Sequence, residues 1–397
     1  MFTSDRVKVL LPGILSMLVA WNTIAAQPQS YRDLFEEYLD MEQALVDEKL
    51  EAAWNHYFYG RDESQRLYYP VEEDMAYIWD VGNNDVRSEG MSYGMMIAVQ
   101  LDKQEEFNRI WKWAKTYMYH DSGPRKGFFA WHCETDGTQI DPGSASDGEE
   151  WFAMALFFAS HRWGNGQGIY DYQAEANAIL DAMLLDRDPP LTCMWDKEEK
   201  MVRFVPVKIW AQVTDPSYHL PAFYELWARW ADHNQGFWKE ASQVSREFFR
   251  KAAHPETGLM ADYTYMDGRP YVHGGHEDFR FDAWRNFSNV ALDYAWWQKD
   301  PWQVEQSDRV LAFLGSFDAF IPNQMKVDGT PLSDSPSTGL YHMAATAGLA
   351  SDRALAEPFV RRLWEAPFEE GKWRYYDGML QLLALLQVSG RYQIWGP

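Results

Sequence analysis

Residues 31–58 read YRDLFEEYLDMEQALVDEKLEAAWNHYF, and apolar side chains recur along this stretch at spacings of three and four. That period is typical of a helix that packs one face against a core. Alternating strand patterns are few and short, the clearest being VRFVPVKIW at 202–210. The sequence therefore predicts about a dozen helices, at 31–58, 90–104, 105–119, 148–163, 171–184, 219–234, 236–252, 283–299, 302–315, 338–349, 352–364 and 375–388.

Residues that favour helix starts support these boundaries. Pro221, Pro301 and Pro358 fall near predicted helix starts, where the missing N–H of proline costs no hydrogen bond. Ser146 and Glu149 have the S-x-x-E spacing of a capping box. The positions of these residues are therefore those expected in a helical protein.

The helical pattern continues from about residue 31 to 390 without a low-complexity linker or a block of charge. A chain of 397 residues with 46% hydrophobic content can bury a sizeable core. Hairpins of similar length predict an all-α fold with a single toroid of helices, an (α/α)6 barrel, and the alternative is an open helical solenoid. A closed barrel would bring alternate helix N-termini together around one mouth.

The N-terminal residues have the pattern of an export signal. Arg6 and Lys8 precede the apolar run VLLPGILSMLVAW, and the small residues Ala25 and Ala26 follow it. The apolar run is too short for a membrane span. We therefore expect a signal peptide at 1–26, a single domain at 27–397, and a protein exported to the periplasm or the medium.

Charge and composition narrow the class of partner. The chain has 36 Lys and Arg against 59 Asp and Glu, and this net charge of −23 opposes binding to nucleic acid. Aromatic residues make up 16%, including 20 Trp and 22 Tyr, and such rings either fill a core or stack on the face of a sugar. Cys133 and Cys193 are the two thiols. We expect no stabilising disulfide between them, because two cysteines in a large exported chain seldom form such a framework.

Three acidic residues lie at the predicted starts of aromatic-rich helices. They are Glu89 in DVRSEGMSYGMMIAVQ, Asp147 in GSASDGEEWFAMALFFASHRWG and Asp282 in FRFDAWRNFSNVALDYAWW. Each alone is explained by the helix dipole, which favours a negative charge at a helix start. Together they suit carboxylates that converge on a cleft for acid–base chemistry on a sugar.

Four longer segments carry a resemblance to a known family. They resemble glycoside hydrolase family 8, and within it the reducing-end xylose-releasing exo-oligoxylanases. The resemblance covers nearly the whole chain after the signal, and it implies an (α/α)6 barrel, an inverting mechanism, β-1,4-linked substrates and neither a metal nor an organic cofactor. The segments are residues 85–118, 127–164, 214–232 and 375–395.

The resemblance also implies roles for single residues. Glu89 of SEGMSYGMM matches the general acid, and Asp282 of FRFDAWRN matches the general base. Asp147 of SASDGEEW matches a residue that binds the central sugar in a distorted ring form. Tyr218 of TDPSYHLPAFY matches an active-site tyrosine near the same subsite.

Further residues are candidates from the pattern itself. Trp131 and Tyr93 are candidates for sugar contact, with plain packing as the alternative, and Arg87 and Arg285 flank the acids and could orient or neutralise them. The histidines lack a helical i, i+4 pair with a nearby carboxylate, so we expect polar or stacking roles rather than a metal site. These histidines are His132, His219, His273, His276 and His342.

The sequence does not determine where on the sugar chain the enzyme cuts, at the reducing end or internally. In the exo-oligoxylanases a Leu-His-Pro loop closes the groove beyond the +1 subsite, but here Ser335 and Pro336 occupy the His-Pro position, with one extra residue before Gly339. We expect that the barrier remains and that a monomeric enzyme releases xylose from the reducing end of xylo-oligosaccharides. An endo-β-1,4-xylanase is the alternative within the family, and an exported non-catalytic glycan-binding protein is the alternative from another class.

Overall fold

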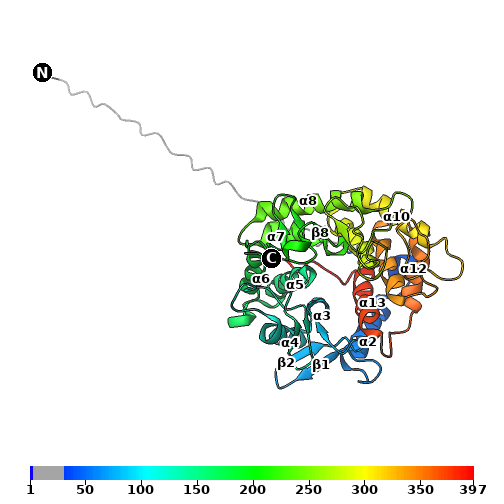
Figure 1. Ribbon diagram of the computed structural model, residues 1–397, viewed down its shortest axis with the longest axis horizontal. Helices are drawn as coiled ribbons and strands as arrows, with labels where there is room; N and C mark the ends of the chain where they lie inside the picture. Colours follow the sequence, from blue (N-terminus) through cyan, green and yellow to red (C-terminus); the bar gives the residue numbers. More distant parts are fainter. Residues whose placement is uncertain (3–30) are drawn as a thin grey trace. The chain divides into compact units, whose positions relative to one another are not determined.

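The computed structural model describes residues 1–2 and 31–397, and the helices of Tyr31–Pro397 are arranged in two concentric rings (Figure 1). The inner ring consists of α3 (Ser88–Gln100), α5 (Ser146–Trp163), α7 (Pro221–Trp230), α9 (Asn286–Trp297), α11 (Thr338–Thr346) and α13 (Arg374–Val388). The outer ring consists of α2 (Gln43–Tyr59), α4 (Gln104–Trp113), α6 (Tyr172–Met183), α8 (Gln235–Ala252), α10 (Trp302–Leu314) and α12 (Arg353–Glu365). The short helix α1 (Leu34–Leu39) packs on α12.

The position of a helix in the two rings follows from its residues. In α5 every residue from Ser146 to Ser160 is buried, which suits a helix covered on all sides. In α4 only Phe107, Ile110, Trp111 and Trp113 are buried, so one apolar face packs inward and the charged face is left in water. The other inner and outer helices repeat this contrast.

The inner ring is closed. Helix α13 contacts α11 on one side and α3 on the other, so the last helix of the ring meets the first. Helices α3 and α5 pack together, as do α7 with α9 and α9 with α11. The rings of Trp151 on α5 and Phe223 on α7 lie 5.2 Å apart and complete the circle. The closed (α/α)6 barrel predicted from the sequence is confirmed, and the open solenoid is wrong.

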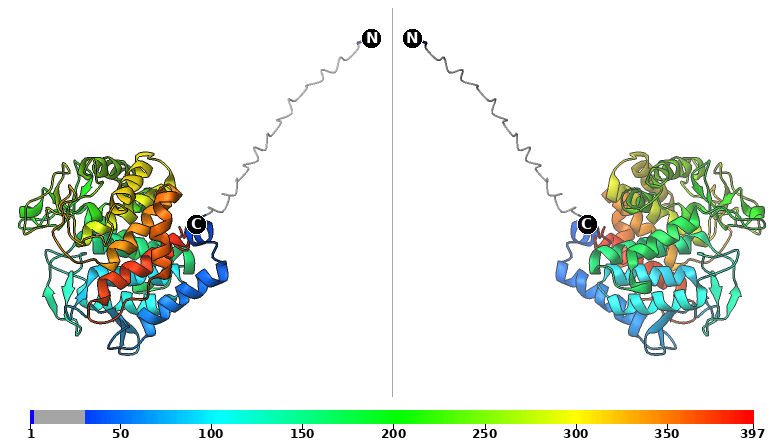
Figure 2. Two further views of the ribbon diagram at one scale, coloured as in Figure 1. Left: turned by 90° about the vertical axis from the view of Figure 1, so that its right-hand side faces the viewer. Right: turned by 90° about the vertical axis from the view of Figure 1, so that its left-hand side faces the viewer.

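Short antiparallel strands lie in the connections that lead into the inner helices (Figure 2). Strand β3 (Val86–Arg87) runs directly into α3 and pairs with β4 (His132–Cys133), which pairs with β5 (Gln139–Asp141). Strand β8 (Val213–Thr214) precedes α7 and pairs with β9 (Thr264–Tyr265). The remaining pairs are β1 (Tyr68–Val71) with β2 (Met75–Ile78), and β6 (Trp195–Asp196) with β7 (Met201–Val202).

The structure corrects the predicted helix at 31–58 and the predicted strand at 202–210. The helix is interrupted at Asp40, whose left-handed backbone (φ 54°) ends α1 before α2 begins. The strand is limited to β7, because its later residues form a 3-10 turn at Lys208–Trp210. Alternation in so short a segment did not distinguish a loop from a sheet.

The structure also differs from two local sequence signals. Pro358 lies inside α12 rather than near its start. Ser146 is not the cap of a capping box, because its hydroxyl donates to the carbonyl of Arg203 at 2.6 Å, while Glu149 accepts the N–H of Phe129. Pro221 is the first residue of α7, as its position predicts. Cys133 and Cys193 are both free and buried.

The predicted signal peptide at 1–26 lies almost entirely outside the described residues. Within residues 31–397, every helix is too short or too polar to cross a bilayer.

Candidate active site

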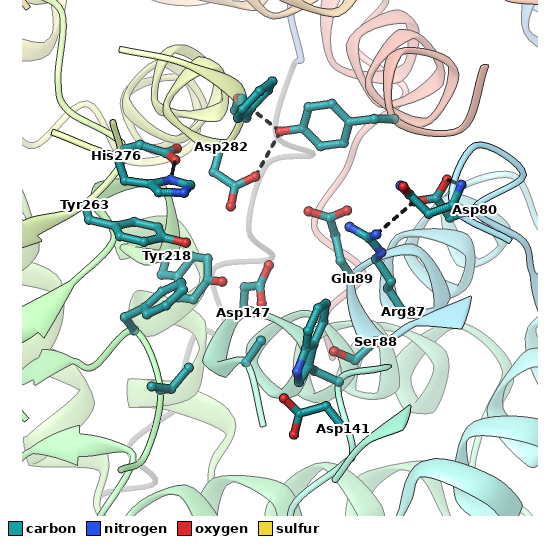
Figure 3. Close-up of a pocket in the computed structure, with 18 of the residues that line it drawn as sticks. Asp80, Arg87, Ser88, Glu89, Asp141, Asp147, Tyr218, Tyr263, His276 and Asp282 are labelled. Carbon is teal, nitrogen blue, oxygen red and sulfur yellow. Dashed lines mark hydrogen bonds and ion pairs between the residues drawn. The ribbon is translucent and has the colours of Figure 1, made fainter. Parts of the chain in front are cut away.

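The N-terminal ends of the inner helices surround a cavity of about 1030 Å³ (Figure 3). Glu89 is the second residue of α3, and Asp147 is the second residue of α5. Asp282 lies in the 3-10 helix η5 (Phe281–Arg285), directly before α9, and Tyr218 ends the 3-10 helix η4 (Pro216–Tyr218), shortly before α7. The three acidic side chains point toward one another into the cavity. The structure thus brings together residues that are far apart in the sequence.

Two glycines allow the acidic helix starts to approach their neighbours. A Cβ atom on Gly90 would lie 2.5 Å from the hydroxyl of Tyr375, and a Cβ atom on Gly148 would lie 2.5 Å from Oγ of Ser88. Both distances are too short for any side chain at these positions. The glycine that follows each acid in SEGMSYG and SDGEEW therefore permits close packing of α3 against α13 and α5.

One guanidinium connects all three acids. Nη1 of Arg285 lies 2.9 Å from Oε2 of Glu89 and 3.2 Å from Oδ2 of Asp147, and Nη2 lies 3.2 Å from Oδ2 of Asp282. Nη2 also donates to Oγ of Ser217 at 2.9 Å. Because Arg285 is buried and contacts several carboxylates, its positive charge partly offsets their mutual repulsion.

The environment of Glu89 favours its protonated form. Burial raises the pKa of Glu89 to about 7, with further upward contributions from Asp282 and Asp147 and a downward one from Arg285. Burial also raises the pKa of Asp147. The hydroxyl of Tyr375 donates to Oε1 of Glu89 at 3.2 Å. Glu89 can therefore hold a proton near neutral pH and release it to a bound group.

Asp282 faces Glu89 across the cavity and has a more open environment. Its side chain is 27% exposed, against 5% for that of Asp147. The hydroxyl of Tyr376 donates to Oδ1 of Asp282 at 3.4 Å. A carboxylate with solvent access is suited to activate a water molecule.

Of the other predicted site residues, two line the cavity and two lie behind its wall. Tyr218 and Trp131 line the cavity, and the ring of Trp131 stacks on His132 at 4.5 Å with Arg87 5.7 Å away. Tyr93 and Arg285 lie behind the wall. The buried hydroxyl of Tyr93 contacts Arg285, so Tyr93 supports the arginine rather than touching a sugar, which differs from the expected contact.

Most of the aromatic residues that line the cavity could not be identified from the sequence. Trp373 at the start of α13 is 67% exposed and lines the cavity, and Tyr376 reaches toward Asp282. The high aromatic content gave a signal for such a wall, but not for which rings form it. The other wall aromatics are Phe204, Trp210, Tyr263, Phe281, Trp284 and Tyr375.

A second group of carboxylates lies beside Asp282. Asp215, Asp262 and Asp282 each place an oxygen within 4.8 Å of the others, a grouping that a metal ion could also use. The spacing of the histidines argues against a histidine-based metal site but carries no information on this carboxylate group. Of those histidines, His276 stacks on Tyr263 at 4.2 Å. His219 is buried between Thr214 and Ser245.

A helical barrel whose mouth holds a protonatable carboxyl group opposite a second carboxylate has the parts of a glycoside hydrolase. Comparison with known families agrees, since residues 78–390 match the model of glycosyl hydrolases family 8. The chain belongs to this family and is a glycoside hydrolase.

Relatives that match nearly the whole chain are named as reducing-end xylose-releasing exo-oligoxylanases. The chain is 47% identical to the reducing-end xylose-releasing exo-oligoxylanase Rex8A of Paenibacillus barcinonensis, over 92% of this chain and 97% of the relative. It is 40% identical to a reducing end xylose-releasing exo-oligoxylanase of Halalkalibacterium halodurans, over 93% and 95%. Among solved structures, a xylohexaose complex of a catalytic mutant of a family 8 xylanase from Teredinibacter turnerae superposes with a TM-score of 0.90 at 45% identity, over 92% and 98%.

Proposed function

We propose that this enzyme hydrolyses β-1,4-xylosidic bonds of xylo-oligosaccharides with inversion and releases xylose from the reducing end. The observation that carries the proposal is the placement of Glu89 and Asp282 on opposite sides of the cavity with Arg285 between them. The similarity to exo-oligoxylanases over nearly the whole chain supports the substrate class.

Each carboxyl group has one task in this reaction. Glu89 donates its proton to the glycosidic oxygen as the bond to the anomeric carbon breaks. Asp282 takes a proton from a water molecule that attacks the same carbon from the opposite face. Inversion requires carboxyl groups roughly 6.5–9.5 Å apart, which leaves room for that water. We assign to Asp147, which Arg285 holds between the two, the binding of the sugar at the point of cleavage.

The segment 331–337 supports the release of a single terminal sugar. The carbonyl of Ser335 accepts the backbone N–H of Asn323 at 2.9 Å, and Oγ of Ser337 donates to Asp377 at 3.0 Å. Asn323, Ser337 and Asp377 all line the cavity, so this segment is fastened to its wall. A fastened loop can limit the number of sugar units that fit beyond the cleaved bond.

Endo cleavage is the second candidate. Ser335 stands where the resemblance leads us to expect a histidine. A relative that is 45% identical is a xylanase, and the structure of its catalytic mutant is a complex with xylohexaose. An enzyme without that histidine has one fewer polar group to recognise a reducing end.

Xylotetraose labelled with ¹⁸O at its reducing end distinguishes the two candidates. Mass spectrometry of the early products should show labelled xylose and unlabelled xylotriose. Abundant xylobiose at early times, or a rapid fall in the viscosity of polymeric xylan, would contradict exo action. A failure to cleave any xylo-oligosaccharide would contradict the proposed substrate class.

We also propose that residues 1–26 direct export and that the enzyme, residues 27–397, acts as a monomer without nucleic acid. The basic residues, apolar run and small residues at the N-terminus support export, and the net charge of −23 argues against nucleic acid. N-terminal sequencing of the exported protein and its mass in solution by light scattering test both statements.

A further inference from the structure

The strand pair β8–β9 places two buried aspartates beside the proposed base. Asp215 follows β8 directly, and Asp262 lies shortly before β9, so the antiparallel pairing of Thr214 with Thr264 brings them to the same end of the ladder. Both are fully buried, and each has an oxygen within 4.8 Å of one on Asp282. Three carboxylates this close cannot all be ionised without a large cost in free energy.

The hydrogen bonds of Asp262 are those of a carboxylate. Its Oδ2 lies 2.5 Å from Nδ1 of His276, and its Oδ1 accepts the backbone N–H of Ala283 at 3.2 Å. Burial lowers the pKa of His276, so this histidine is neutral at neutral pH, and with its proton on Nδ1 it donates to Asp262. Burial and the charge of Asp282 raise the pKa of Asp262, but these two donors act in the opposite direction and favour its charged form. Asp215 has one such donor, so of the two aspartates Asp262 is the one that carries the charge.

Asp215 has the surroundings of a neutral acid. Its Oδ1 accepts the N–H of Ser217 at 2.7 Å, and among the residues that the structure describes its buried Oδ2 has no hydrogen-bond partner. An ionised carboxylate with one buried, unpartnered oxygen would be costly, whereas a protonated carboxyl group leaves no charge without a partner. Burial, with the charges of Asp282 and Asp262, raises the pKa of Asp215 well above its ordinary value.

The contact between Asp262 and Ala283 fixes the backbone next to the base. Ala283 follows Asp282 in η5, and Phe281 before it has a φ of 38°, a conformation that is costly for a bulky residue. A hydrogen bond at this point holds the turn that directs Asp282 into the cavity.

We propose that Asp262 and Asp215 are positioning residues for Asp282: Asp262 supplies a fixed negative charge and holds η5, and Asp215 remains a neutral acid behind it. This inference rests on the function proposed above, in which Asp282 is the base. It assigns to the charge of Asp262 an upward contribution to the pH at which the enzyme loses activity in acid.

Other ionisable groups also face Asp282, and they stay in place in the variants below. Arg285 comes from η5 itself, Glu89 from α3, Asp147 from α5, Tyr218 from η4 and Tyr376 from α13, with Tyr263 and His276 beside Asp262 and Arg280 before η5.

The test is the acidic limb of kcat/KM against pH, measured with a short xylo-oligosaccharide. Asp262→Asn removes a negative charge beside Asp282, which favours the ionised base, so the limb should move to lower pH by about one unit or more. Asp215→Asn replaces a neutral acid with a neutral amide of the same shape, so the limb should stay within about 0.3 unit of wild type. Asp278→Asn is the control. It removes a carboxylate shortly before η5 that forms an ion pair with Arg280.

A purely structural role would lower kcat in the variants without moving the limb, and that result would overturn the inference. An equal downward shift in Asp215→Asn and Asp262→Asn would also overturn it, because both residues would then be charged. So would a loss of wild-type activity on dialysis against a chelator that is restored by Ca²⁺ or Mg²⁺, since a bound cation keeps Asp215 ionised. The infrared band of a protonated carboxylic acid, present in wild type and lost in Asp215→Asn, reports the proton even in a variant of low activity.

Failure of the proposed function has a different signature from failure of this inference. If wild type releases no sugar from any xylo-oligosaccharide, the function is wrong. If wild type is active and the limb does not move in Asp262→Asn, the inference is wrong.

Discussion

At the scale of single residues, the chemistry depends on one arginine shared by three acids. Arg285 holds Glu89, Asp147 and Asp282 in one arrangement, while burial keeps a proton on Glu89. The acids were selected from the sequence because they begin helices in glycine- and aromatic-rich contexts. Their common contact with Arg285 could not be predicted from the sequence, because the guanidinium joins segments that only the tertiary fold brings together.

Glu89→Ala should reduce the hydrolysis of xylo-oligosaccharides by at least about 100-fold, because the reaction then lacks the carboxyl group to which we assign proton donation. The matched control is Glu105→Ala, an acid in the first turn of α4 that is exposed to solvent. Reducing-sugar release measures both, and circular dichroism should show unchanged helix content. A Glu89→Ala variant with more than a few per cent of wild-type turnover would refute the assignment.

Activity should fall as the pH rises through about 7, because Glu89 acts in its protonated form and burial raises its pKa to about 7. Arg285 lowers the pKa of Glu89, so Arg285→Met should raise that pKa and move the alkaline limb of the pH–rate profile to higher pH, with a reduced kcat. Rate measurements across the pH range check the direction. A shift to lower pH would mean that Arg285 does not act on Glu89.

At the scale of elements, the inner helices depend on close approach at their first turns. Helix boundaries followed well from periodicity, because each long helix has an apolar face or is buried all round. Periodicity did not predict three other features: the short strands, the break at Asp40 and the place of Pro358 inside α12. Each depends on few residues, and tertiary contacts override local preference there. The β8–β9 pair was missed for the same reason, and with it Asp215 and Asp262 as neighbours of the base.

Gly148→Ala should destabilise the protein by about 1–3 kcal/mol, because the new methyl group would overlap Ser88. It should also reduce kcat, since Asp147 and Glu89 lie beside the displaced atoms. Gly236→Ala is the control: Gly236 is in α8, where a Cβ atom meets nothing within 4 Å, and the change should be neutral or slightly stabilising. Denaturant unfolding measures both. Equal stability of the two variants would refute the packing argument.

At the scale of the whole barrel, the ring determines the distance between the catalytic groups. Glu89 begins α3 and Asp282 precedes α9, and these helices are three places apart in a ring of six inner helices within residues 31–397. The acid and the base therefore stand on opposite sides of the mouth. The closed ring was predictable from the number and similarity of the helices. The sequence did not predict which loops narrow the mouth.

The first sugar formed from a β-linked xylo-oligosaccharide should accordingly be the α-anomer, because carboxyl groups on opposite sides leave room for an attacking water. Proton NMR during the first minutes of the reaction resolves the two anomers. If the β-anomer formed first, a covalent intermediate and closely spaced carboxyl groups would be required.

The fastening of segment 331–337 to the cavity wall has a consequence for how such enzymes diverge. The residues to which we assign chemistry come from the N-terminal ends of the inner helices and from the loops beside them, whereas the two rings supply the buried core. Insertions and exchanges in one rim loop can therefore alter the length of the product without disturbing the core. Relatives that cut at chain ends and relatives that cut within chains can share a single scaffold, and selection can act on product pattern and on thermal stability through separate sets of mutations.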